Sequence, residues 1–262
     1  MSCPATFHAC RSVLVTGASR GIGLELVRQL AAGRAPPGRI IATARNPATA
    51  TKLQELAQKF SNVHVVGLDV VSDDSIHSCV EEVERLVQGD GLNCLINNAG
   101  ISVEADLHSV TCEKMMENFH TNSVAPLMLT KALLPLLKRA ASARSGAAAR
   151  LGVHRAVVIN MSSTLGSMTL NTGEMARLVK WYPYRTSKSA LNMLTRCLAG
   201  DLDPHHILCM AIHPGWVRTN MGGPQGQLSP EESACSVLSV IAGLEEKDQG
   251  SFLNESGETL PW

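Results

Sequence analysis

The fold of this chain can be inferred from one segment, Thr16-Gly17-Ala18-Ser19-Arg20-Gly21-Ile22-Gly23. The segment follows a short apolar run at residues 12–15 and precedes a helical pattern that continues through Leu24, Val27 and Leu30. Glycines allow the backbone to turn sharply and to approach a ligand closely, and the unpaired N–H groups at the start of a helix attract an anion. A strand, a glycine turn and a helix in this order predict a βαβ unit that binds the pyrophosphate of a dinucleotide.

The remainder of the chain alternates short apolar runs with longer helical patterns, which is typical of βαβ units in a parallel sheet. Strands are expected at residues 12–15, 39–43, 63–68, 93–96, 156–161, 208–212 and 251–254. Helices are expected at residues 21–32, 48–60, 73–87, 112–139, 184–202 and 230–244. We therefore predict an α/β Rossmann fold in a single domain, residues 1–262, with a doubly wound parallel sheet of about seven strands and helices on both faces.

Three segments interrupt this alternation. Residues 140–155 are rich in Ala, Arg, Ser and Gly and are expected to extend or fray the preceding helix as a solvated connection. Residues 166–183 are long and polar and end in Trp181 and Tyr182, which favours a loop at the mouth of a site. Residues 220–229 are rich in Gly and Pro and are expected to form a mobile lid.

Composition excludes several classes of function. The 23 basic and 23 acidic residues are interspersed, so no basic surface for nucleic acid is indicated. The eight cysteines show no Cys-x-x-Cys spacing, which favours reduced thiols. Residues 1–10 lack an apolar leader, and no apolar run reaches the roughly 18 residues that a membrane span needs. We therefore expect a cytoplasmic protein with no metal site and no membrane or nucleic-acid partner.

Charge predicts which dinucleotide binds. In a site for NAD, an acidic residue after the second strand accepts hydrogen bonds from the ribose hydroxyls and repels a 2′-phosphate. Here the second strand ends in Thr43-Ala44-Arg45, without a carboxylate, and Arg20 lies in the glycine segment. Both guanidinium groups can bind a 2′-phosphate through a fork of hydrogen bonds. We therefore predict NADP(H) as the cofactor, with two solvated surface arginines as the alternative.

Several motifs occur in the order that one enzyme family shows. They are Thr16 to Gly23, Asp69-Val70, Asn97-Asn98-Ala99-Gly100, Asn122, Ser162-Ser163, Tyr184-x-x-x-Lys188 and Pro214-Gly215-x-Val217-x-Thr219. Through them the chain resembles the short-chain dehydrogenases/reductases over nearly its whole length. Within that family it is most similar to the sniffer-type, C-factor-like carbonyl reductases, through residues 160–163, 184–192 and 213–217.

The resemblance implies NADP(H) as the cofactor and a small carbonyl compound as the substrate. In the family's scheme Asp69 and Val70 contact the adenine, and Asn98 and Gly100 line the ribose side. Thr219 reaches the carboxamide of the nicotinamide. The full set of cofactor-binding residues implied in this way is Gly17, Ser19, Arg20, Gly21, Ile22, Gly23, Arg45, Asp69, Val70, Asn98, Ala99, Gly100, Tyr184, Lys188, Pro214, Gly215, Val217 and Thr219.

Some of these side chains have a structural alternative. Asp69 could cap a turn before the helix expected at residues 73–87, and Asn97 could brace neighbouring strands. Trp181, Trp216 and Met221 could supply apolar walls for the substrate, although a core position for Trp216 is equally compatible with a lone aromatic residue after a strand.

The spacing of one tyrosine and one lysine indicates proton chemistry. Residues four apart on a helix share one face, which selects Tyr184, with Lys188 four residues on, over Tyr182, which has Thr186. A unit positive charge at about 4 Å, at an effective dielectric near 20, favours a phenolate by up to about 4 kcal/mol. That energy corresponds to roughly three pKa units. We therefore expect Lys188 to lower the pKa of Tyr184 toward the working range of a general acid.

The resemblance implies the catalytic set Asn122, Ser163, Tyr184 and Lys188. Tyr184 would give a proton to the developing alkoxide while the hydride of NADPH attacks the carbonyl carbon, and Ser163 would hydrogen-bond the same oxygen. Lys188 would also hold the nicotinamide ribose, and Asn122 would hold the water of a proton relay at a helix kink. Ser162 stays the alternative to Ser163, because the segment between the serine pair and Tyr184 is longer than is usual in the family.

Two other functions stay open at this point. The first is a signalling or sensor protein that binds NADP(H) without turnover, against which the intact catalytic set argues. The second is NAD-dependent oxidation of alcohols, which Arg20 and Arg45 disfavour. The sequence does not select among reactive aldehydes, ketones and quinones, and it leaves the oligomeric state open, with a homodimer and a homotetramer as the candidates.

Overall fold

The computed structural model describes residue 7, residues 9–143 and residues 150–262. Cys3 and the middle of the connection expected at residues 140–155 lie outside the described residues. No disulfide joins the cysteines within the described ranges. No helix in the described ranges combines the length and the apolarity that a membrane crossing requires.

A parallel sheet of seven strands forms the centre of the molecule, in the order β3-β2-β1-β4-β5-β6-β7. The strands are β1 Ser12–Val15, β2 Arg39–Ala44, β3 Val63–Gly67, β4 Cys94–Asn97, β5 Ala156–Met161, β6 Ile207–Ile212 and β7 Phe252–Leu253. Every residue of β1, β4, β5 and β6 is buried, as expected where helices cover both faces of a parallel sheet. The prediction of a doubly wound sheet with seven strands is confirmed.

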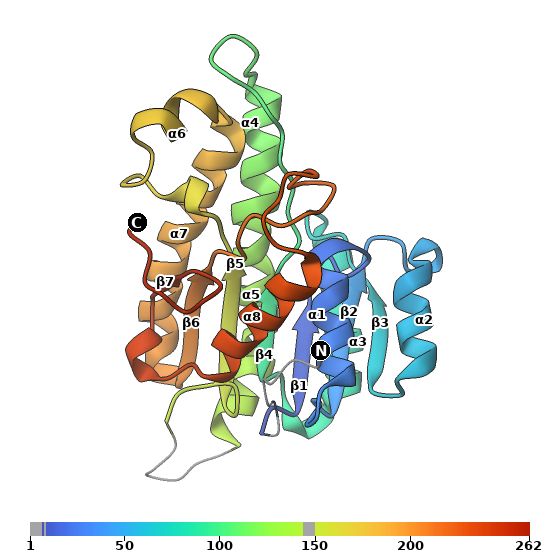
Figure 1. The fold of residues 1–262 in the computed structure, drawn as a ribbon. Helices are drawn as coiled ribbons and strands as arrows, with labels where there is room; N and C mark the ends of the chain where they lie inside the picture. Colours follow the sequence, from blue (N-terminus) through green and yellow to red (C-terminus); the bar gives the residue numbers. More distant parts are fainter. Residues whose placement is uncertain (1–6, 8, 144–149) are drawn as a thin grey trace.

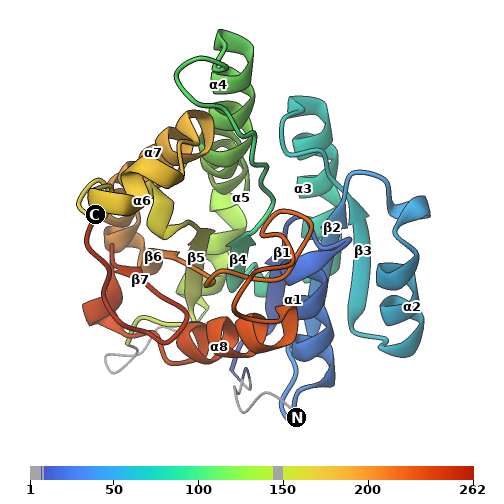
Figure 2. The ribbon, with the colours of Figure 1, turned by 45° about the horizontal axis from the view of Figure 1, so that its top comes forward.

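Helices cover the two faces of the sheet in separate layers (Figures 1 and 2). The helices are α1 Gly21–Ala32, α2 Thr51–Lys59, α3 Asp73–Val87, α4 Cys112–Phe119, α5 Ala125–Ser142, α6 Gly173–Leu178, α7 Tyr182–Leu202 and α8 Pro230–Ala242. One apolar cluster packs α1, α2 and α8 against the sheet through side chains such as Leu26 and Val237. A second cluster packs α3, α5 and α7 against the other face, for example through Val83 and Leu133. Each such side chain contributes roughly 1.5–3 kcal/mol when it is fully buried.

The order of the strands reverses between β1 and β4. Strands β1, β2 and β3 follow one another toward one edge of the sheet, and β4 to β7 follow one another toward the other edge. Loops that leave the carboxyl ends of β1 and β4 therefore diverge and leave a crevice, which is where open α/β sheets bind their ligands.

The structure corrects the expected helices at three places. The helix expected at residues 112–139 is interrupted by one π-helical turn, His120–Val124, which separates α4 from α5. The loop expected at residues 166–183 contains α6, and α7 begins at Tyr182 because Pro183 is well suited to the first turn of a helix. The helix expected at residues 48–60 is divided into a short 3-10 turn, Pro47–Thr49, and α2.

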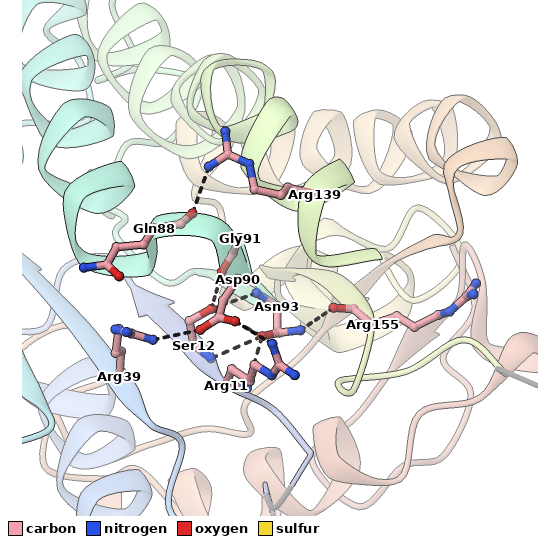
Figure 3. A network of polar contacts seen from close by, with 9 residues as sticks. All are labelled: Arg11, Ser12, Arg39, Gln88, Asp90, Gly91, Asn93, Arg139 and Arg155. Atoms are coloured by element: carbon pink, nitrogen blue, oxygen red, sulfur yellow. Dashed lines mark hydrogen bonds and ion pairs between the residues drawn. The ribbon is translucent and has the colours of Figure 1, made fainter. Parts of the chain in front are cut away.

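A network of polar contacts lies at the amino ends of the strands (Figure 3). The Asn93 Oδ1 atom accepts from Arg11 N at 3.1 Å and from Ser12 N at 3.3 Å. Its Nδ2 atom donates to Arg155 O at 2.6 Å, so one amide links β1 to the start of β5. Asp90 forms ion pairs with Arg11 and Arg39 on the solvent side of this network. The amino ends of the strands lie opposite the crevice, and we assign this network a structural role.

Replacing Asn93 by alanine should lower the free energy of unfolding by about 2–3 kcal/mol, because the buried groups it serves lose their partner. Asn93 is only 3% exposed. Asn46→Ala is the matched control, since Asn46 is exposed and its side chain accepts a single hydrogen bond, from Ala48 N. That change should cost only about 0.5–1 kcal/mol, because it removes the cap of the short turn Pro47–Thr49. Urea denaturation measures both values, and similar losses in the two variants would contradict this account.

Candidate active site

The glycine segment forms a tight turn at the carboxyl end of β1. Gly17 and Gly21 have φ values of +65° and +58°, which side-chain-bearing residues rarely adopt. A Cβ atom at Gly23 would lie 2.5 Å from Gly17 O, and one at Gly17 would lie 2.9 Å from the Ala99 Cα atom. Ser19 and Ile22 are partly buried between these glycines. The backbone N–H groups at the start of α1 are thus brought to the crevice, as a pyrophosphate site requires.

Thr16 ties this turn to the loop that follows β4. Its Oγ1 atom accepts from both Asn98 N and Ala99 N at 2.9 Å. The Asn98 side chain donates in return to Thr16 O at 2.8 Å. The Asn98 amide, expected to line the ribose side, is therefore used to brace the glycine turn. Gly100 continues this loop toward the catalytic residues, since a Cβ there would lie 3.1 Å from Asn122 Oδ1 and 3.8 Å from Lys188 Nζ.

Arg20 and Arg45 are exposed at the same end of the sheet. Among the interactions of the described residues, neither guanidinium forms a hydrogen bond or an ion pair, so both are available to an anion. Asp69 caps a turn, as its structural alternative proposed, by accepting from Val71 N at 3.3 Å. Val70 lines a small pocket together with Thr16, Ala99 and Thr121. The residues expected to bind the cofactor after β1, β3 and β4 thus lie around one crevice, and its glycines and exposed cations fit a phosphorylated dinucleotide.

Tyr184 and Lys188 lie on one face of α7, beside the end of β5. The Tyr184 phenol shares a hydrogen bond with the Ser163 side chain. The Lys188 Nζ atom lies 5.7 Å from the centre of the Tyr184 ring and donates to Met161 O at 2.7 Å. The lysine therefore has further N–H groups for a ligand, because an ammonium has three.

Burial changes the acidity of both groups. Tyr184 is partly exposed as a residue, yet its phenol is closely surrounded by protein, and this desolvation raises its pKa to about 12, against the smaller lowering effect of the Ser163 hydrogen bond. The expectation that Lys188 lowers this pKa is therefore wrong for the protein alone, since burial dominates. Burial also lowers the pKa of Lys188 to about 8, which leaves the ammonium charged at neutral pH. At pH 7 the pair consists of a neutral phenol and a cation.

The two neighbouring serines point to different partners. The Ser162 Oγ atom donates to Asn192 Oδ1 at 2.5 Å, about two turns along α7 from Tyr184. The Ser163 hydroxyl instead contacts Tyr184 and accepts from Leu165 N at 3.1 Å. Of the two hydroxyls, only that of Ser163 is placed to reach a substrate oxygen at Tyr184.

Asn122 lies in the π-helical turn between α4 and α5. Its side chain pairs with the backbone of Ile101, donating to Ile101 O at 2.8 Å and accepting from Ile101 N at 2.9 Å. Asn122 also donates to Ser187 Oγ at 3.0 Å. π-helical turns inside longer helices occur frequently at functional sites. A π-helical turn therefore stands where the resemblance implied a helix kink.

The loop after β6 closes the crevice from the side of α8. Gly215 has a φ of +82°, and Pro214 O accepts from Ser233 Oγ of α8 at 2.7 Å. Val217 is buried and pairs with Leu228, which closes the base of the segment expected to be a lid. Thr219 reaches the glycine turn, because a Cβ at Gly21 would lie 3.5 Å from Thr219 Cγ2. Whether the segment moves stays a prediction.

Trp216 does not occupy the core. The side chain is 49% exposed, and its Nε1 atom donates to Gly222 O at 2.7 Å. Met221, 46% exposed, lies on the same segment, and the Trp181 ring meets the Tyr184 ring edge to face at 6.3 Å. These apolar side chains remain candidates for walls of a substrate site.

Two contributors to the site were missed in the sequence. Gly166 packs directly on α7, where a Cβ would lie 2.7 Å from Lys188 C, and no pattern in the sequence distinguishes this glycine from a loop glycine. Ser187 supports Asn122, and its position directly before Lys188 was the available signal.

Asn97 braces strands, as its alternative proposed, by donating to Asn160 Oδ1 at 2.9 Å. In the part of the chain that the structure describes, no cluster of three His, Cys, Asp or Glu side chains could hold a metal.

Comparison with known proteins gives consistent matches. Residues 11–228 match the family model described as short chain dehydrogenase. The carbonyl reductase Sniffer of D. melanogaster is 42% identical with a TM-score of 0.91, over 97% of this chain and 100% of that chain. The NADPH-bound carbonyl reductase from chicken fatty liver is 43% identical with a TM-score of 0.92, over 97% of this chain and 94% of that chain. The C-signal protein of Myxococcus xanthus is 37% identical over 172 residues, which are 65% of this chain and 93% of that protein.

The raised pKa of Tyr184 can be measured directly, because the chain has only two tyrosines. In Tyr182→Phe, Tyr184 is the sole phenol, and its phenolate absorbance should appear only as the pH approaches about 12. An ordinary phenol titrates near 10. A full absorbance step at or below pH 10 in the folded variant would contradict the dominance of burial. Circular dichroism at each pH checks that the protein is still folded.

Proposed function

Because the chain belongs to the short-chain dehydrogenase family, we propose that it is an NADPH-dependent reductase of small carbonyl compounds, such as ketones, quinones and reactive aldehydes. One observation carries the proposal: the neutral phenol of Tyr184, hydrogen-bonded to the Ser163 side chain, lies beside the Lys188 ammonium. The carbonyl reductases named above support the substrate class, since they are similar over nearly the whole chain. NADPH in the chicken enzyme supports the choice of cofactor.

The proposed cofactor site uses the glycine turn and two cations. The pyrophosphate would lie on the backbone N–H groups at the start of α1, where the helix dipole favours an anion. Arg20 and Arg45 would bind the 2′-phosphate that distinguishes NADPH from NADH, because both are exposed and uncommitted in the described structure. The same two cations argue against the NAD-dependent oxidation of alcohols.

The proposed reaction needs a hydride and a proton. NADPH, when bound, supplies the hydride to the carbonyl carbon. Tyr184 gives its phenolic proton to the oxygen as negative charge develops there, and the Ser163 hydroxyl donates a hydrogen bond to the same oxygen. The phenol carries its proton at neutral pH, as a proton donor must.

Lys188 and Asn122 have supporting roles in this proposal. With one N–H on Met161 O, the Lys188 ammonium can direct its others at the nicotinamide ribose and at the phenol, where its charge stabilises the phenolate left after proton transfer. Asn122 keeps the π-helical turn open by pairing with Ile101, which leaves backbone carbonyls of that turn available to a relay water. Location in the cytoplasm and assembly as a homodimer or homotetramer stay predictions.

A signalling protein that binds NADP(H) without turnover is the second candidate. The similarity to C-signal favours it, since that protein is named as a signal. Such a protein would have little need for a proton donor held between a serine and a buried ammonium. Absence of NADPH oxidation with a broad panel of ketones, quinones and aldehydes would favour this candidate over the reductase.

Tyr184→Phe should lower kcat/KM for carbonyl reduction by about a hundredfold to ten-thousandfold, because it removes the general acid. The dissociation constant for NADPH, measured by fluorescence, should change by less than about twofold, since the phenyl ring still fills its place. Tyr182→Phe is the matched control, because Tyr182 is exposed and only two residues away. If both variants keep wild-type kcat/KM, Tyr184 is not the proton donor.

Arg45→Asp should reverse the preference for NADPH over NADH. The carboxylate repels the 2′-phosphate and can accept bonds from the ribose hydroxyls instead. We expect the dissociation constant for NADPH to rise about tenfold to a hundredfold, the loss of a hydrogen bond between charged groups. Arg34→Asp makes the same charge change at an exposed arginine beyond the far end of α1 and should leave both affinities unchanged. An equal rise of the dissociation constant for NADPH in Arg45→Asp and Arg34→Asp would contradict a specific contact of Arg45 with the 2′-phosphate.

A further inference from the structure

The segment between Ser163 and Tyr184 has a proposed catalytic residue at each end. It begins with the turn Thr164–Gly166, continues through residues 167–172 and α6, and ends at Trp181, whose ring meets that of Tyr184. Met168 and Leu170 in its middle are 71% and 40% exposed. We call residues 164–181 the bridging segment, because it links the serine to the tyrosine on the outside of α7.

The first residues of the bridging segment are held by α7. Gly166 O accepts from Ser189 Oγ at 2.7 Å, and the backbone of Gly166 touches that of Lys188. Further along, Asn171 Oδ1 accepts from Arg185 Nη1 at 2.9 Å. The contacts of Gly166 hold the turn that follows Ser163 on α7.

The middle of the bridging segment is held from a different direction, by the last residue of the sequence. Thr169 N donates to Trp262 O at 3.0 Å. In both views of the fold the C-terminal end lies beside the segment that leads to α6 (Figures 1 and 2). Residues 167–172 are therefore tied to Trp262 at Thr169 and to α7 at Asn171.

Two side chains contact the ring of Trp262. The ring stacks on Phe252 of β7 with centroids 5.4 Å apart, and Phe252 is 1% exposed. The Arg196 guanidinium of α7 lies 5.9 Å from the centre of the Trp262 ring, and Arg196 also donates to Gly250 O at 3.1 Å. Leu260 N donates to Phe252 O at 2.8 Å, so the backbone before Trp262 is paired with β7 as well.

We propose that Trp262 is a positioning residue that holds the middle of the bridging segment, and with it one wall of the substrate entrance. The expected effect on substrates rests on the proposed function. The positioning of the bridging segment by Trp262 rests on its contacts with Thr169 and Phe252. Because α7 holds the turn that follows Ser163, loosening Trp262 should leave the chemical step intact. It should weaken the binding of substrates large enough to reach the wall.

The test compares Trp262→Ala with Trp262→Phe in steady-state reduction of a three-ring carbonyl, phenanthrenequinone, and a small one, butanedione. In Trp262→Ala the KM for phenanthrenequinone should rise about threefold to tenfold, the loss of one ring contact. Its kcat, and the KM for butanedione, should stay within about twofold. Trp262→Phe keeps a ring on Phe252 and should restore most of the affinity. Phe119→Ala removes an exposed ring from α4 and serves as the surface control.

Hydrogen exchange at the Thr169 amide gives a readout that needs no turnover. It should be faster in Trp262→Ala than in the wild type, and it should return toward the wild-type rate in Trp262→Phe. Arg196→Gln, which leaves both aromatic rings in place, should give a smaller change in the same direction and provides the test if Trp262→Ala does not fold. Unchanged exchange at Thr169 in these variants would overturn the proposal.

The kinetic results separate the two proposals. A loss of kcat with both carbonyls, together with weaker NADPH binding, would mean that Trp262 supports the whole fold, and the positioning role would be wrong. A wild-type protein that reduces no carbonyl, but shows the expected exchange at Thr169, would overturn the proposed function and leave the hold by Trp262 supported.

Discussion

The hydrogen bonds of Thr16 are the constraint on which the site depends. One hydroxyl at the end of β1 accepts from two backbone N–H groups at the end of β4, and Asn98 donates back to the backbone of Thr16. These bonds join the two strands where their order in the sheet reverses. The glycine turn on one side and the loop toward Asn122 on the other therefore keep a fixed separation, and a ligand lying across both finds the crevice already formed.

Burial shifts the pKa values of the two titratable groups on α7, Tyr184 and Lys188, in opposite directions. Desolvation disfavours the charged form of each group, so it raises the pKa of the Tyr184 phenol and lowers that of the Lys188 ammonium. At neutral pH the phenol still carries its proton, and the lysine still carries its charge. A phenol with so high a pKa is a poor proton donor until negative charge develops on an acceptor beside it. Proton transfer is therefore coupled to the formation of that charge.

Much of the fold followed from local sequence patterns, because buried parallel strands and glycine turns leave strong local signals. The bounds of β1, β5, α1 and α3 agree with those expected from sequence. The π-helical turn at Asn122 was not visible, since the apolar spacing continues across it, and α6 was hidden in a polar segment. The direction of the Tyr184 pKa shift was also missed, because spacing along a helix gives the distance to Lys188 but not the density of atoms around the phenol.

The contact of Gly166 with the backbone of Lys188 has a mechanical consequence. With no side chain between them, the turn that follows Ser163 packs directly on the helix that carries Tyr184, and we expect the two to move together. Thermal displacement of α7 then carries hydroxyl and phenol together, so their mutual geometry is preserved while their distance from a bound molecule varies. An enzyme built in this way can admit ligands of differing bulk and still present the same pair of donors to each of them.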